Sequence, residues 1–101
     1  MNLFIYILPF LLFNFSTPID DDCTCKGIKL QGDVRVVEGT ADLDVRVVEG
    51  IADLDVRAVS GITMRCGEWH FVEGEADFTI RYVDGLADLE IRFVDGLAGM
   101  Q

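Results

Sequence analysis

The sequence has few of the side chains that carry acid–base and nucleophilic chemistry, with one histidine and three cysteines in 101 residues. Positive charge is also scarce, since eight Lys and Arg residues stand against eighteen Asp and Glu residues, and the formal net charge is −10. A nucleophile and its base therefore have few candidates, and an acidic chain is repelled by a phosphate backbone. We expect no enzyme activity and no nucleic-acid partner.

Proline is scarce too, with two residues in the chain, and half of the residues are hydrophobic. This composition excludes a disordered chain, which is typically rich in proline and charge and poor in apolar residues. A chain of this length can bury one compact core but not two independent ones. We expect a single small folded domain.

An apolar run, Leu3–Phe15, lies near the amino terminus, and no charged side chain precedes Asp20. Its about 13 residues match the hydrophobic region of a secretory signal and fall short of the roughly 20 that a membrane helix needs. We interpret residues 1–17 as a signal peptide cleaved near Ser16 or Thr17, with a retained anchor as the alternative. The prediction is a secreted or periplasmic protein that is not attached to a membrane after cleavage.

Three cysteines in an exported chain allow one disulfide, which stabilises a small domain by restricting its unfolded state. Cys23 and Cys25 lie in a short amino-terminal arm, residues 18–27, whereas Cys66 lies in the middle of the chain. We predict a bridge between Cys25 and Cys66, with Cys23 to Cys66 as the second option. The three cysteines and His70 also have the ligand types of a zinc site, but C-x-C spacing is less usual there than C-x2-C. We therefore expect no metal and no cofactor.

The strongest pattern is an internal repeat with a period of eleven residues. Each unit contains a glycine preceded by Glu, Asp or Ser, and these glycines are Gly39, Gly50, Gly61, Gly74, Gly85 and Gly96. The step from the third glycine to the fourth is two residues longer than the others. The units therefore form two halves of three, residues 33–63 and 68–99, within a β-repeat domain predicted to cover residues 28–101.

Apolar and charged side chains alternate inside each unit, which is the period of a β-strand with one buried face. In one unit Leu43 and Val45 point to one side while Asp44 and Arg46 point to the other. β-Branched and aromatic residues fill the apolar positions of the other units, as strands prefer. The repeat predicts an all-β fold of six or seven short strands.

Charge offers a test of which strands pair. The Glu-Gly and Asp-Gly dipeptides are typical of tight turns, and Asp-Gly favours type I′. If each turn closes a two-residue hairpin, favourable pairs meet across it: Arg35–Asp42, Arg46–Asp53, Arg81–Asp88 and His70–Asp77. An in-register parallel stack of successive units would instead set like charges opposite each other, which is destabilising. The charges therefore favour hairpins between successive strands.

The two halves are complementary in side-chain size. At an offset of 35 residues, small residues of the first half correspond to large residues of the second, as in Val34–Trp69, Leu43–Phe78, Val47–Tyr82 and Ala58–Phe93. Such a relation fits two halves that fill one shared interior without voids. Strand parity places Trp69 and Phe71 in the inward set, so core packing is favoured over a carbohydrate-stacking platform.

The acidic units contain one candidate ligand pattern, Asp42-x-Asp44 and Asp53-x-Asp55. It is like the D-x-D of metal-dependent sugar transferases or a calcium-binding ladder of carboxylates. Because arginines of opposite sign accompany these aspartates in the same units, we interpret the pattern as a solvated strand face.

Three segments together resemble the septoil knot family, small exported or cell-associated bacterial proteins of unknown function. They are Cys23-Thr24-Cys25-Lys26-Gly27-Ile28, Cys66-Gly67-Glu68-Trp69-His70-Phe71-Val72 and Asp95-Gly96-Leu97-Ala98-Gly99. The resemblance implies one small β domain whose backbone forms a seven-crossing torus knot, with the two halves wound around each other. The turns here are leaner than in many relatives, which carry an aromatic residue before the acid, and no functional residue is carried over from the family.

The sequence therefore predicts an exported, monomeric structural module whose useful property is stability, with no assignable biochemical activity. The alternative is an acidic binding module for a cell-envelope glycan or a calcium-bridged partner.

Overall fold

The computed structural model describes residues 18–100, and every regular element in that range is a β-strand. The strands are β1 (Thr24–Cys25), β2 (Ile28–Lys29), β3 (Gly32–Val36), β4 (Leu43–Val47), β5 (Leu54–Ala58), β6 (Glu68–Phe71), β7 (Phe78–Tyr82), β8 (Leu89–Phe93) and β9 (Gly99–Met100). One strand, from β3 to β8, comes from each repeat, so the predicted all-β fold is confirmed. The predicted signal peptide, residues 1–17, lies outside the described residues.

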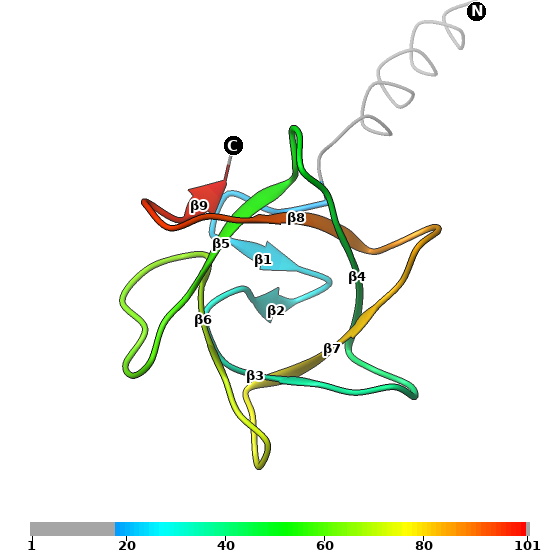
Figure 1. Cartoon of the computed structure of the whole chain (residues 1–101), viewed down its shortest axis with the longest axis horizontal. Helices are drawn as coiled ribbons and strands as arrows, with labels where there is room; N and C mark the ends of the chain where they lie inside the picture. The colour runs from blue at the N-terminus through cyan, green and yellow to red at the C-terminus, as the bar shows by residue number, and fades with distance from the viewer. Residues whose placement is uncertain (1–17, 101) are drawn as a thin grey trace, which may run out of the picture.

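The six repeat strands form a closed barrel in the order β6-β3-β7-β4-β8-β5, and pairing of β5 with β6 closes it. All six pairings around the barrel are parallel. Each strand of the first half therefore lies between two strands of the second half. Figure 1 is a view along the barrel axis and shows this ring, with the connecting loops projecting outward from it.

The hairpin prediction is wrong, because every pairing between repeat strands is parallel, including that of β5 with β6, the one pair of successive repeat strands that are neighbours. The stagger of the strands explains how parallel strands are joined by short loops. Val36 at the end of β3 and Leu43 at the start of β4 both align with Ile80 of β7, which lies between them. The end of one strand is thus level with the start of the next strand of the same half, about 10 Å away across one intervening strand. Residues 37–42 need only bridge that gap.

The turns also differ from the predicted type I′ geometry. That turn requires positive φ angles at both central residues. Among the described residues, the glycines with positive φ are Gly27, Gly32, Gly67 and Gly99, and none of them is the glycine of a repeat turn. The repeat turns are therefore wide connections rather than tight hairpin turns.

The barrel interior is one apolar core to which both halves contribute. Its repeat residues are Val34, Leu43, Val45, Leu54, Val56, Trp69, Phe78, Ile80, Leu89 and Ile91. Trp69 is fully buried, and its ring meets the Phe78 ring edge to face with the centroids 5.5 Å apart. The predicted core role of Trp69 is confirmed. Tyr82 and Phe93 have the predicted inward parity, but they are the last residues of their strands and are 44 and 42% exposed.

The amino-terminal arm covers the mouth of the barrel at which the strands begin. Figure 1 shows β1 and β2 projected within the ring, and the two strands pair antiparallel. Leu30 is fully buried, and its carbonyl accepts hydrogen bonds from the Gly67 amide at 2.9 Å and from the Trp69 indole at 3.2 Å. Cys23 and Cys25 of the arm belong to the same buried cluster, so the arm and the residues that follow it are part of the core.

Candidate functional site

Four repeats contain the dipeptide Ala-Asp just before the strand, and the four aspartates bind backbone amides of the other half. We call this arrangement the aspartate clamp. The carboxylates of Asp42, Asp53, Asp77 and Asp88 accept hydrogen bonds from the amides of Thr79, Glu90, Asp33 and Asp44, respectively, over 2.7 to 2.9 Å. Three of these aspartates, at positions 53, 77 and 88, also donate their own amides to the partner carbonyls. The clamp therefore joins the start of a strand to its neighbour from the other half.

Charged pairs continue the same cross-half contacts along the outer face of the barrel. Arg81 binds the Asp44 carboxylate through two hydrogen bonds, both 3.0 Å long. Arg92 binds Asp55 in the same two-pronged way over 3.1 Å. Asp44 raises the pKa of the Arg81 guanidinium through this hydrogen bond and its charge. Further ion pairs of the face are Arg46–Glu90 and Lys26–Asp88, and His70 Nδ1 lies 3.0 Å from Asp33.

The two aspartates of each D-x-D pattern therefore have different structural roles. The first aspartate of each pattern, Asp42 or Asp53, is part of the clamp, and the second, Asp44 or Asp55, holds an arginine. Within residues 18–100, no group of three or more His, Cys, Asp or Glu side chains is placed to hold a metal ion. The solvated-face interpretation missed the clamp, because alternation alone does not show that a carboxylate can reach a neighbouring amide.

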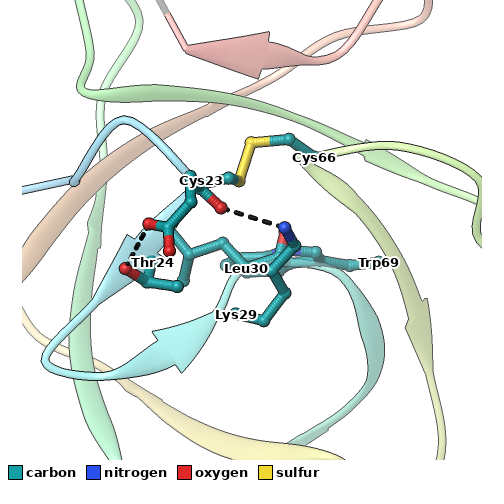
Figure 2. Close-up of a disulfide and its surroundings, with 7 residues drawn as sticks. Cys23, Thr24, Lys29, Leu30, Cys66 and Trp69 are labelled. Atoms are coloured by element: carbon teal, nitrogen blue, oxygen red, sulfur yellow. Dashed lines mark hydrogen bonds between the residues drawn. A yellow bond between two sulfur atoms is a disulfide. The ribbon is translucent and has the colours of Figure 1, made fainter.

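The disulfide joins Cys23 to Cys66, so the preferred pairing of Cys25 with Cys66 is not the one that forms. The Cys25 thiol instead points into the barrel, where it is 2% exposed and lies 3.9 Å from the Asp88 carbonyl. Cys23 has a φ of 65°, which turns the chain and directs its side chain toward Cys66. Figure 2 shows the bridge beside the hydrogen bond from the Leu30 amide to the Cys23 carbonyl.

The chemistry of the cysteines follows from this placement. Cys23 and Cys66 are oxidised, so they do not combine with Cys25 and His70 into the four-ligand zinc site considered above. Burial raises the pKa of the Cys25 thiol, and the nearby Asp88 carboxylate acts in the same direction. A buried thiol that stays protonated at neutral pH is a poor nucleophile.

Among residues 18–100, the apolar interior is covered at one end of the barrel only. At the opposite end, where the six strands finish, Val36, Val47, Tyr82 and Phe93 are each more than 40% exposed. Partial burial raises the pKa of Tyr82 above its usual value. Among residues 18–100 no helix is long and apolar enough to span a membrane.

The architecture defines a class, the small closed β-barrel built by interleaving the parallel strands of two three-strand halves. The family model described as the 7(1) septoil knot domain matches residues 27–101. The chain therefore belongs to the septoil knot family, whose function is unknown, as the resemblance in the sequence indicated. A comparison with curated proteins finds no match.

Proposed function

We propose that the protein is an exported structural module that keeps a fixed shape outside the cytoplasm, where it must resist unfolding and proteolysis. The observation that carries the proposal is the Cys23–Cys66 bridge, which ties the arm to the start of β6 across a sequence separation of 43 residues. A cross-link of that span stabilises a small domain by about 2–4 kcal/mol. Disulfides persist in oxidising compartments, which agrees with the predicted signal peptide and a secreted or periplasmic location.

The interleaved barrel supports the same role. Every barrel strand is held on both sides by strands of the other half, so releasing one strand breaks two ladders. The family implies a knotted backbone, which would further restrict local opening. Proteases cut chains that open locally or globally, and a slow opening step gives kinetic resistance.

Limited proteolysis tests the proposal. We expect the oxidised protein to remain intact under trypsin for hours, although Arg65 lies exposed in the longest loop, between β5 and β6. A matched variant, C23S/C66S, keeps the charges and the loop but lacks the bridge, and we expect it to be cut first in the arm. Cleavage of the oxidised protein within minutes after Arg65 would count against a structural role based on durability.

A mass measurement tests export and oxidation independently. The protein recovered from outside the cytoplasm should begin near residue 18, and reduction should add the mass of two hydrogens for one bridge. A mass that includes residues 1–17, or one that reduction leaves unchanged, would contradict this part of the proposal.

The acidic binding module stays the alternative. In its calcium form, a bridging ion would have to compete with the amides and arginines that already occupy Asp42, Asp44, Asp53 and Asp55. Calcium titration with thermal unfolding tests it, because a ligand that binds only the folded state raises the melting temperature. An unchanged melting temperature would reject the calcium form.

A further inference from the structure

The two mouths of the barrel bury their apolar residues to very different extents. The mouth at which the strands begin is covered by the arm and by residues 28–30 that follow it, and Cys25 and Leu30 from these two segments are buried in the core. The mouth at which the strands end has no such cover among the described residues. We call it the open mouth.

The open mouth is lined by the last inward residue of each strand. In ring order from β6 these residues are Phe71, Val36, Tyr82, Val47, Phe93 and Ala58, so large rings from the second half alternate with small side chains from the first. The Phe71 and Phe93 centroids lie 6.3 Å apart, with Ala58 on the strand between them. Val36, Val47, Tyr82 and Phe93 are 42 to 46% exposed. The lining is therefore a nearly continuous apolar surface.

Two hollows flank Phe71 at the edge of this surface. One, of about 410 Å3, is lined by Arg35, Val36, Phe71, Val72 and Glu73. The other, of about 580 Å3, is lined by Arg57, Ala58, Val59, Ser60, His70 and Phe71. Side chains of a partner can therefore enter on either side of the Phe71 ring.

An acidic rim surrounds the apolar lining. Five of the six loops that leave this mouth carry an exposed acidic residue, two positions after the lining residue of their strand. These residues are Glu38, Glu49, Glu73, Asp84 and Asp95. Arg35 and Arg57 bring positive charge to the side near β6. The arginines in the same position on the other strands, Arg46, Arg81 and Arg92, are paired with acids of the outer face, so the rim as a whole is negative. Charges around an apolar patch select a partner of opposite charge and repel one of the same charge.

We propose that the open mouth is a docking surface for another protein that presents an apolar centre bordered by Lys and Arg. An exposed apolar patch with a polar border is the usual form of such a site. A second copy would bring two acidic rims together, and an anionic membrane would meet the same repulsion. Charge therefore selects the basic partner over these two occupants.

A synthetic peptide of alternating Leu and Lys serves as the probe, with a Leu–Glu peptide of equal length for comparison. We expect the Leu–Lys peptide to shift the backbone amide NMR signals of Val37, Val48, Val72 and Val83, next to the open mouth, and to leave those of Ile51 and Leu86 in place. The triple variant E73Q/D84N/D95N should bind at least about tenfold more weakly at low salt, and high salt should remove the difference.

Two matched controls separate the mouth from general stickiness and general charge. I51S/L86S removes two loop-tip residues that are 88 and 89% exposed, and it should leave affinity unchanged, whereas V47S/Y82S should lower it. D20N/D21N/D22N removes three charges from the arm at the other mouth and should have little effect. Each variant is first shown to unfold cooperatively. E73Q/D84N/D95N alters only exposed turn residues, so we expect its core packing to be unchanged.

Several results would overturn the proposal. Equal weakening by D20N/D21N/D22N would show a non-specific charge effect, and equal binding of the Leu–Glu peptide would show that the rim does not select. A concentration-dependent dimer in sedimentation that V47S/Y82S abolishes would assign the mouth to a second copy. Binding to anionic vesicles with shifts at the same amides would assign it to a membrane.

Discussion

Single aspartates link the two halves at the start of the strands. The Ala-Asp step recurs in the sequence because each clamp carboxylate satisfies an amide of the neighbouring strand, as Asp77 does for Asp33 over 2.7 Å. Hydrogen bonds to charged groups are stronger than neutral ones, and an unpaired amide is costly. The acid excess of the chain thus has a structural use, besides its effect on surface charge.

Gly32 offers a direct test of the clamp. It has a φ of +127°, and a Cβ atom there would overlap the Asp77 carboxylate. We expect Gly32→Ala to destabilise the protein by about 2–3 kcal/mol, from backbone strain and loss of the clamp bond together. In the Asp77→Ala background, the same substitution should cost only the strain, about 1 kcal/mol. Urea unfolding of the four proteins measures both values.

Gly39→Ala is the matched control for this cycle. Gly39 lies in a repeat turn, where an added Cβ meets nothing within 4 Å and φ is not positive. We expect a change of less than about 0.5 kcal/mol. Equal costs for Gly32→Ala with and without Asp77 would show that the carboxylate is not clamped as described.

Individual strands were readable from the sequence, but their partners were not. Alternation of residues such as Leu43, Asp44 and Val45 predicted a strand in each repeat, and the barrel contains one strand from each of the six. The charges did not separate the two pairing schemes, because Arg81 meets an acid in both, Asp88 in a hairpin and Asp44 in the barrel. The ambiguity is resolved only by the stagger between strands that are distant in sequence. That stagger produces no pattern in the local sequence of either strand.

The same limit applied to the arm and to the open mouth. Cys23 and Cys25 are two residues apart, so strand alternation places them on the same side and does not distinguish them. In the structure they differ because Cys23 has a positive φ, and a cysteine at that position gives no sign of it, as a glycine or asparagine would. The size relation between the halves was visible, but its placement around one mouth depends on the ring order of the strands. The pairing of the arm's cysteines and the arrangement of the aromatic residues around the open mouth therefore became clear only from the fold.

The pair Asp55 and Arg92 tests the observed pairing of β5 with β8. Their side chains are 18 and 38% exposed, so solvent weakens the pair only in part. A double-mutant cycle with Asp55→Asn and Arg92→Met should give a coupling energy of about 0.5–1 kcal/mol that declines at high salt. The free energy of unfolding in urea is the measurement.

Arg35 and Asp42 are the control pair for this cycle, since a hairpin would set them opposite each other. In the barrel Arg35 donates to the Gly74 carbonyl and Asp42 accepts from Thr79. We expect the coupling between Arg35→Met and Asp42→Asn to be much smaller. A larger coupling here than at Asp55 and Arg92 would favour the hairpin arrangement.

At the scale of the whole molecule, the contacts that hold the barrel are almost all distant in sequence. The charged pairs of Asp44 with Arg81 and of Asp55 with Arg92 each span 37 residues. Such contacts form late and slowly, because the chain must be ordered over a long loop before they stabilise it. We infer that the barrel folds slowly and that its durability comes from slow unfolding as well as from equilibrium stability.

Dividing the chain between Thr63 and Met64 tests whether the halves depend on each other. In the described barrel, each of β3, β4 and β5 finds its ladder partners among β6, β7 and β8, apart from the short β9 beside β5. Residues 18–63 or 64–101 alone would leave the amides of their barrel strands unpaired, so we expect little β-sheet circular dichroism and no cooperative melting from either fragment. Equimolar mixing should restore β structure to a degree that rises with concentration, because association then replaces the chain connection. Cooperative melting of one fragment by itself would show that a half can form its own core, and the interleaved barrel would then not be the unit of stability.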